Sequence, residues 1–127
     1  MKFGAHGEFN LWVEDNIAFI EVSGAWNVET AKDYIYQLNH VIGPQLTKPY
    51  GTVGIMHDDW FPTADAIPYL YRATELAIEQ GMRKEAFVTR SALSASVVSQ
   101  LVLPANSDVY EKRQFENLQD AIAWVKE

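Results

Sequence analysis

The sequence predicts a single α/β domain, 1–127, built on a mixed β-sheet with an N-terminal hairpin and about four helices packed on it. Two observations lead to this fold class. The N-terminal segment alternates apolar and polar residues and turns back on itself, which is typical of a hairpin. The rest of the chain alternates short apolar runs with segments whose apolar residues recur three and four apart, the spacing of a buried helix face. A chain of 127 residues is long enough for one continuous core.

Residues 8–14 and 17–22 form the predicted hairpin. In the first segment apolar residues occupy every second position, so one side of the strand faces a core. The intervening pair Asp15-Asn16 suits a tight two-residue turn, because both residue types tolerate a positive φ. The hairpin ends at Gly24.

The next segment predicts a helix and then a central strand. Asn27 is placed to cap the helix, and Gly43-Pro44 is expected to stop it. The apolar run within 51–56 is short and continuous, which predicts a strand that is central in the sheet and buried on both faces. The helix stripe consists of Ala31, Tyr34, Ile35, Leu38, Val41 and Ile42.

A second helix is predicted immediately after this connection. Asp65 is expected to cap it, which places Pro68 in the first turn, where no backbone N–H donor is required. Gly81 suits the left-handed position that follows the last turn of a helix. The inner stripe consists of Ile67, Leu70, Tyr71, Thr74, Ala77 and Ile78.

The C-terminal third of the chain predicts two further strands and two helices. A short strand covers 85–89, and Ser91 can cap a third helix that Pro104 closes. Residues 108–115 are expected to form an edge strand, whose charged side chains discourage pairing with another sheet. Asn117 caps the final helix, with an acidic residue three positions on, as in a capping box.

The composition excludes several classes of function. Ten Lys and Arg against 17 Asp and Glu give a net charge of −7, which disfavours binding to nucleic acids or anionic membranes. Without cysteine the chain has no disulfide, thiol nucleophile or thiolate metal site. No apolar run is long enough to span a bilayer, and the N-terminus lacks the apolar core of a signal peptide. We therefore expect a cytoplasmic protein.

The segment 57–65, between the central strand and the second helix, is the candidate site. In open α/β sheets, crevices just past the carboxyl ends of strands are where ligands and partners usually bind. His57, Asp58 and Asp59 could hold a metal ion or act as acid and base, but the sequence nominates no further ligand. The alternative is that the two aspartates hydrogen-bond the loop backbone and help to cap the helix. We prefer it, because short acidic runs in loops are most often turn formers.

No catalytic or cofactor motif accompanies this segment. A phosphate-cradling glycine loop, a nucleophile elbow and a dinucleotide fingerprint are all absent from the sequence. His6 and His40 stand apart from any partnered motif, and the serines of 91–99 have no base nearby in the sequence. We predict no catalytic activity, no metal and no cofactor.

Large aromatic residues are frequent for a domain of this size. Trp26 and Trp124 are expected in the core. Trp60 and Phe61 stand in the connection, and Tyr71 lies on the helix that follows. Aromatic rings outside a core stripe are enriched at interfaces and ligand clefts, because they bury much area at little cost in rotamer entropy. For Trp60, a contact surface and closure of the core are equal alternatives.

The element order, together with three local patterns, resembles the STAS fold, and more closely its SpoIIAA-like branch of small single-domain bacterial proteins. The patterns are Gly24-Ala-Trp-Asn-Val-Glu-Thr-Ala31 before the first helix, the segment Val53 to Trp60, and the ending Phe115-Glu-Asn-Leu-Gln-Asp-Ala-Ile-Ala-Trp124. Together with the element order they cover nearly the whole chain. The element order carries most of the weight.

The chain departs from that family at its candidate site. In the family members that phosphate regulates, the corresponding segment carries an Asp-Ser-Ser-Gly-like motif, whose serine is phosphorylated at the start of the helix. Here there is no Ser-Gly pair, and the only hydroxyl is that of Thr63. A phosphate at Thr63 would meet like charge from Asp58, Asp59 and Asp65. We therefore expect no regulatory phosphorylation there.

We predict a non-catalytic binding module, a regulatory or adaptor protein that contacts another protein through the loop 57–65 and the following helix and that could form a homodimer. The alternative is a carrier or sensor of a small apolar or nucleotide-like ligand held between sheet and helices. A sizeable apolar cavity beneath the loop would favour the carrier, and a filled core with exposed aromatics would favour the interaction module. The candidate binding residues are His57, Asp58, Asp59, Trp60, Phe61, Thr63 and Tyr71.

Overall fold

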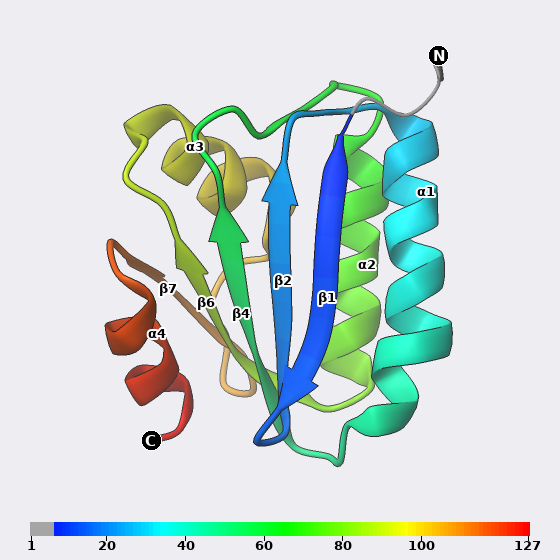
Figure 1. The fold of residues 1–127 in the computed structure, drawn as a ribbon. Coiled ribbons are helices and arrows are strands. Elements are labelled where there is room, and N and C mark those ends of the chain that lie inside the picture. The colour runs from blue at the N-terminus through cyan, green and yellow to red at the C-terminus, as the bar shows by residue number, and fades with distance from the viewer. Residues whose placement is uncertain (1–6) are drawn as a thin grey trace.

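The structure, a computed structural model, describes residues 7–127, so His6 lies outside the described residues. Within that range the chain forms a five-stranded sheet of order β1-β2-β4-β6-β7, in which only the β1–β2 pair is antiparallel (Figure 1). The strands are β1 (Glu8–Glu14), β2 (Ile17–Ser23), β4 (Tyr50–Met56), β6 (Met82–Val88) and β7 (Glu111–Phe115). The helices are α1 (Val28–Gln37), α2 (Ile67–Glu79), α3 (Ala92–Val97) and α4 (Leu118–Val125).

The N-terminal hairpin is confirmed with its turn. Asp15 and Asn16 have φ values of 54° and 60°, as a two-residue turn between twisted strands requires. Glu14 pairs with Ile17, so the predicted alternation places one side of β1 against the helices.

Strand β4 lies at the centre of the sheet, as predicted. It pairs in parallel with β2 on one side and with β6 on the other. Val53 in the middle of this strand is fully buried, and Ile55 is partly buried. The carboxyl end of β4 therefore lies between the ends of its two neighbouring strands, in the middle of one end of the sheet.

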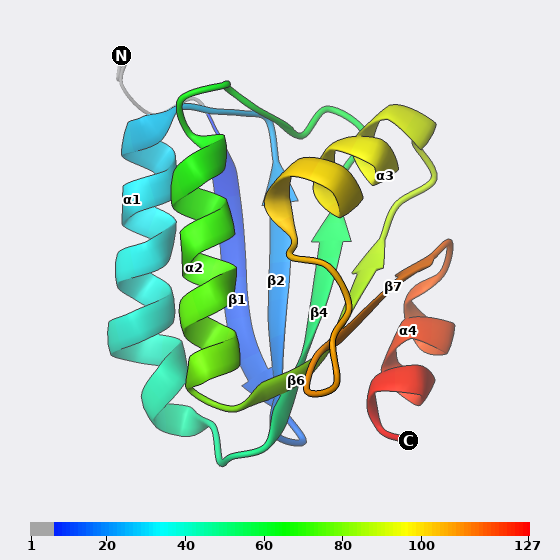
Figure 2. The same cartoon turned by 180° about the vertical axis from the view of Figure 1, so that it is seen from behind.

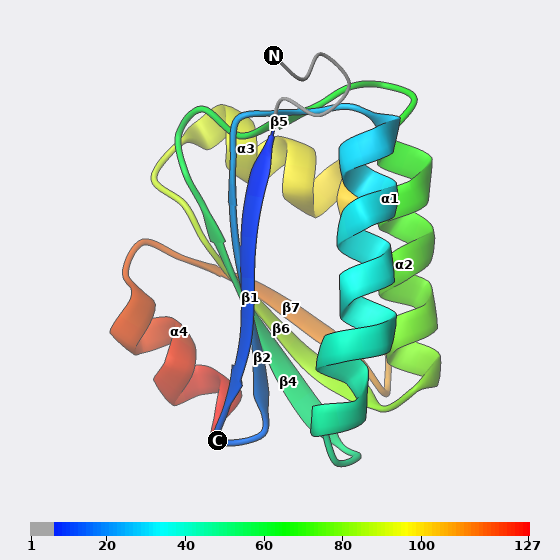
Figure 3. The ribbon, with the colours of Figure 1, turned by 45° about the vertical axis from the view of Figure 1, so that its right-hand side comes forward.

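The sheet separates two apolar cores. Helices α1, α2 and α3 cover one face, seen from their side in Figure 2, and α4 alone packs on the opposite face, where it contacts β4, β6 and β7 (Figure 3). The first core contains Ile20, Val22, Trp26, Trp60, Leu70, Phe87 and Val98 among its buried residues. The second contains Ile17, Phe19, Val53, Ala86, Ala121 and Trp124. Trp26 and Trp124 therefore lie in the core, as expected.

Three of the four predicted helix caps are confirmed. Asn27, Ser91 and Asn117 each precede a helix in extended conformation, and each side-chain oxygen accepts a hydrogen bond from the backbone N–H three residues on. These bonds satisfy donors that the first turn of a helix leaves unpaired.

The predicted cap of α2 is wrong. Ala66, not Asp65, is the cap residue, and it supplies no side-chain hydrogen bond. The carboxylate of Asp65 instead accepts a 2.6 Å hydrogen bond from the Thr63 hydroxyl, so it is committed to the loop. Pro68 does lie in the first turn, as predicted.

Two of the α-helices are followed directly by a π-helix. The π-helix η1 (Leu38–Ile42) and the 3₁₀ turn η2 (Gly43–Gln45) extend α1, so Gly43-Pro44 does not stop the helical path where the sequence predicted. Another π-helix, η3 (Val98–Val102), extends α3. The Lys112 ammonium donates to the backbone oxygens of Ser99, at 2.6 Å, and Leu103, at 3.3 Å, and so satisfies carbonyls at the end of that turn.

Other boundaries differ by a few residues. Strand β6 begins at Met82 rather than at 85, and β7 begins at Glu111 rather than at 108, although β7 is an edge strand as predicted. Sequence analysis missed a two-residue parallel bridge between β3 (Ala25–Trp26) and β5 (Phe61–Pro62). This bridge holds the loop 57–65, which is the candidate site, against the segment that follows the hairpin.

Candidate functional site: the loop after strand β4

The loop 57–65 leaves the carboxyl end of β4 and crosses the end of the sheet before α2 begins. Its path is held by main-chain hydrogen bonds to the segment that follows the hairpin. The Phe61 N–H donates to the Gly24 carbonyl at 3.0 Å, and the Thr63 N–H donates to the Trp26 carbonyl at 2.8 Å. Two short segments far apart in the sequence therefore brace each other, and the loop has a defined shape.

Trp60 belongs to the core. Its side chain is 4% exposed, and its ring meets the Trp26 ring edge-on at a centroid distance of 6.0 Å. Its indole N–H is the only buried side-chain polar atom of residues 7–127 without a hydrogen-bond partner. Of the two alternatives for this residue, the structure places the ring where it closes the core beneath the loop.

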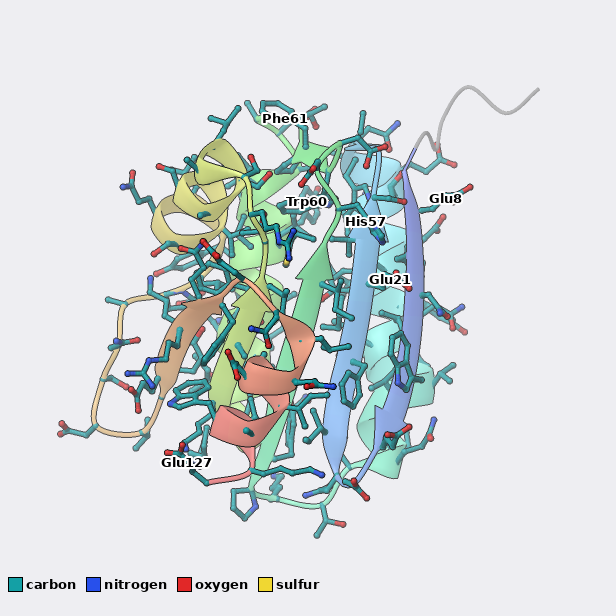
Figure 4. All side chains as sticks on the ribbon, turned by 60° about the vertical axis from the view of Figure 1, so that its left-hand side comes forward. Glu8, Glu21, His57, Trp60, Phe61 and Glu127 are labelled. Carbon is teal, nitrogen blue, oxygen red and sulfur yellow. The ribbon has the colours of Figure 1, made fainter. Side chains whose placement is uncertain are left out.

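Phe61, by contrast, is 52% exposed. Because side chains alternate along an extended backbone, the burial of Trp60 turns its neighbour outward. Figure 4 shows the two rings at the same end of the molecule, with Phe61 at its outer surface. An exposed ring on a braced backbone is the most prominent apolar feature of the loop.

The histidine and the aspartates separate into different environments. The His57 Nε2 atom lies 2.8 Å from a carboxylate oxygen of Glu21 on β2, away from Phe61 (Figure 4). One carboxylate oxygen of Asp59 accepts a 3.2 Å hydrogen bond from the Gly24 N–H. Asp58 is exposed. No cluster of three or more His, Cys, Asp or Glu side chains that could hold a metal ion exists within residues 7–127.

The two remaining predicted residues behave differently. The Thr63 hydroxyl is engaged by Asp65, as described above, and that bond orders the turn into α2. Tyr71 is 37% exposed on α2. No ring contact joins Tyr71 to Phe61 in the described part of the chain.

Trp60 occupies the space beneath the loop, and a cavity lies farther along the sheet. A cavity of about 50 Å³ lies between the sheet, α1 with η1, and α2, and the carboxyl group of Glu85 on β6 lines it. One oxygen of that carboxyl accepts a 2.9 Å hydrogen bond from the Tyr110 hydroxyl. Burial raises the pKa of Glu85 to about 7, because the bond from Tyr110 and the charge of Lys112 offset the loss of solvation only in part.

Sequence analysis placed Glu85 in a strand but gave it no role. The signal was present: Glu85 lies two residues before the buried Phe87, and residues two apart on a strand share a face. An acidic residue on the core face of a central strand is unusual enough to single out.

Comparison with known proteins gives the fold and no more. No family model matches the chain, and no curated protein matches it. The chain is similar in structure to an uncharacterised protein of the DUF3478 family from Shewanella loihica PV-4, described as having a SpoIIAA-like fold. The two share 14% sequence identity with a TM-score of 0.66, and the alignment covers 98% of each chain. The SpoIIAA-like fold suggested by the sequence is confirmed. No helix among residues 7–127 is both long and apolar enough to cross a membrane.

Proposed function

We propose that the protein is a non-catalytic binding module that contacts a partner protein through Phe61 and the surrounding acidic loop. The observation that supports this proposal most is the exposure of Phe61 on a backbone held by hydrogen bonds, next to the buried ring of Trp60. Aromatic side chains that insert into a partner's pocket are among the commonest interface hot spots. A loop whose only task was to connect β4 with α2 would gain nothing from this exposed ring.

The loop is arranged for binding without further ordering. Main-chain hydrogen bonds hold Phe61 and Thr63, and Trp60 packs beneath them in the core. Binding by a preformed surface avoids the entropic cost of ordering a loop when the complex forms. Because the β3–β5 bridge holds the backbone at Phe61, little binding free energy would be lost in ordering this residue.

The charges around Phe61 indicate the chemistry of the partner. Asp58, Asp59 and Asp65 are exposed in the same loop, and the whole chain carries a net charge of −7. An acidic surface with one apolar ring is complementary to a protein surface that places Lys or Arg side chains around an apolar pocket. Such complementarity accelerates association and excludes other acidic proteins.

Two alternatives receive less support. A carrier with its ligand beneath the loop would need space that Trp60 fills. A surface groove of about 240 Å³ does lie beside the His57–Glu21 pair, with Ser23 in its lining. A catalytic site would also need an activated nucleophile, and no hydrogen bond joins the Ser23 hydroxyl to His57 in the described part of the chain. Phosphorylation of Thr63 is also disfavoured, since its hydroxyl already donates to Asp65 and a phosphate would lie among carboxylates.

Quantitative capture of partners from the native host tests the proposal. Wild type, Phe61→Ala and a control, Val109→Ala, would be compared under mild cross-linking. Val109 is a matched control because it is 54% exposed in the loop before β7, outside the proposed surface. We expect at least one protein that binds wild type and the control equally and binds Phe61→Ala about 30-fold more weakly, the scale of a 2 kcal/mol hot spot. The proposal fails if every captured protein binds the three forms alike.

A further inference from the structure

The interior of the domain contains an acidic pocket remote from the loop surface. The cavity described above is mostly apolar, with walls from Ile20, Ile35, Leu38, Ile42, Leu76 and Met82. Glu85, Tyr34 and Tyr50 also line it, and their side chains carry a carboxyl group and two hydroxyls. An apolar cavity with a few convergent polar groups is the usual form of a small-molecule site.

Two of the polar groups have bonding capacity left over. Tyr110 bonds one oxygen of Glu85, but the other oxygen has no hydrogen-bond partner within residues 7–127, and neither has the hydroxyl of Tyr34. Neither group is sealed in the protein without a partner, because Trp60 is the only described residue with a buried unpaired side-chain polar atom. Both atoms therefore reach open space, and a bound molecule can use them.

The carboxyl group has no direct ion-pair partner, although the charge of Lys112 lowers its pKa. Glu85 takes part in none of the ion pairs formed by the described residues. The nearby ammonium of Lys112 is committed to the carbonyls of Ser99 and Leu103 instead. An ionised carboxyl group in such surroundings is unfavourable unless a positive charge joins it.

The cavity has a mouth at the end of α2. A surface groove of about 300 Å³ shares five lining residues with the cavity, namely Asn39, Gly43, Leu46, Tyr50 and Gln80. One wall of the mouth comes from the π-helix η1 and the turn after it, and π-turns are frequent at functional sites. Lys48 lines the outer groove but not the cavity. A second positive charge on a ligand would therefore meet repulsion at the mouth.

We propose that this cavity binds the ammonium group of a small primary monoamine, with Glu85 as its counter-ion and the Tyr34 hydroxyl beside it. The apolar lining accommodates the carbon chain, and the remainder of the molecule extends into the outer groove. This site is independent of the proposed contact through Phe61. Anionic ligands, nucleotides included, are excluded by the carboxylate.

Calorimetric titration with probes of equal chain length tests this site. Butylamine, 1-butanol and butyrate would each be titrated at pH 8, where a pKa of about 7 leaves Glu85 mostly ionised. We expect butylamine to bind at least tenfold more tightly than 1-butanol, 1,4-diaminobutane to bind more weakly than butylamine, and butyrate not to bind. Equal binding of butylamine and 1-butanol, or no binding of butylamine, would overturn the proposal; the second result would mean that only water fills the cavity.

A variant locates the binding. Glu85→Gln keeps the size of the side chain and an acceptor for Tyr110, and we expect it to weaken butylamine at least tenfold while leaving 1-butanol unchanged. Unaltered butylamine affinity in a folded Glu85→Gln protein would refute the assignment to Glu85. If that variant does not fold, the wild-type ranking of the four probes still decides. A cavity-filling change, Ala73→Leu, should abolish binding of both butylamine and 1-butanol, because Ala73 lines the cavity.

Discussion

Glu85 is an acidic residue in mostly apolar surroundings, and burial raises its pKa. It lies on the face of β6 that α1 and α2 cover. Burial raises the pKa of Tyr34 and Tyr50, and the charge of Glu85 raises both pKa values further. The pKa of Tyr50 rises to about 12. The same carboxyl group, through charge and hydrogen bond, adds to the effect of burial on Tyr110. All three tyrosines therefore stay neutral, and Glu85 is the titrating group at ordinary pH.

The pH dependence of stability follows from the raised pKa of Glu85. The folded-state pKa of about 7 exceeds the 4.5 of an exposed glutamate, so the folded protein holds the proton more tightly. The resulting stabilisation is complete below pH 4.5 and is lost as the pH rises through 7. We expect Glu85→Gln to match wild type near pH 4, where Glu85 is protonated in the folded protein and mostly protonated in the unfolded chain. At pH 8 its free energy of unfolding should exceed that of wild type by on the order of 3 kcal/mol.

Denaturant melts of both proteins at these two pH values measure the effect. Tyr110→Phe is the companion variant, because it removes the hydrogen bond that lowers the pKa of Glu85. A difference between wild type and Glu85→Gln that is the same at both pH values would contradict the account.

At the scale of elements, the local signals in the sequence were reliable where they depended on neighbouring residues. The turn at Asp15-Asn16 and the cap at Asn117 follow from side-chain chemistry within a few positions, and both are present. Asp65 misled because it has the right residue type for a cap, while Thr63 competes for its carboxylate. The β3–β5 bridge was not predictable, since two-residue strands show no periodicity and their pairing is long-range.

The difference between these caps is measurable. Asn117→Ala should lower the free energy of unfolding by about 1 kcal/mol, because it leaves the Asp120 N–H in the first turn of α4 without its partner. Asp65→Ala should cost much less, since Asp65 accepts no hydrogen bond from the backbone of α2. Equal losses, determined by chemical denaturation under the same buffer conditions, would show that Asp65 acts as a cap after all.

At the scale of the whole molecule, the order of elements sufficed to predict the sheet and its central strand, but not the site. Burial of Trp60 depends on the approach of Trp26 from a segment more than thirty residues earlier. The cavity depends on how η1 and α2 pack over β6, and π-turns leave no clear pattern in the sequence. Such three-dimensional arrangements arise from packing between distant segments, which local patterns do not record.

The packing of α4 against the sheet can be tested by substitution. A Cβ atom at Gly51 on β4 would collide with the side chain of Val125 on α4. Gly51→Ala should therefore push the end of α4 away and cost about 1 to 3 kcal/mol, as overpacked cores do. Gly43→Ala is the comparison, because a Cβ atom there would lie 3.3 Å from the Leu38 carbonyl oxygen, a tight contact but a much longer one than the contact with Val125 at Gly51. Amide exchange and denaturant melts should show the larger change in Gly51→Ala; an equal response would place the constraint elsewhere.

The central claim is that the loop anchors one aromatic ring in the core and holds the next one out for a partner. The free energies of unfolding of Trp60→Ala and Phe61→Ala, from denaturant melts, test it most directly. We predict a loss of about 3 to 5 kcal/mol for Trp60→Ala, as for a buried aromatic side chain. For Phe61→Ala we predict a change within about 0.5 kcal/mol, as for a surface substitution. A loss of several kcal/mol in Phe61→Ala would contradict the account, because Phe61 would then stabilise the fold itself.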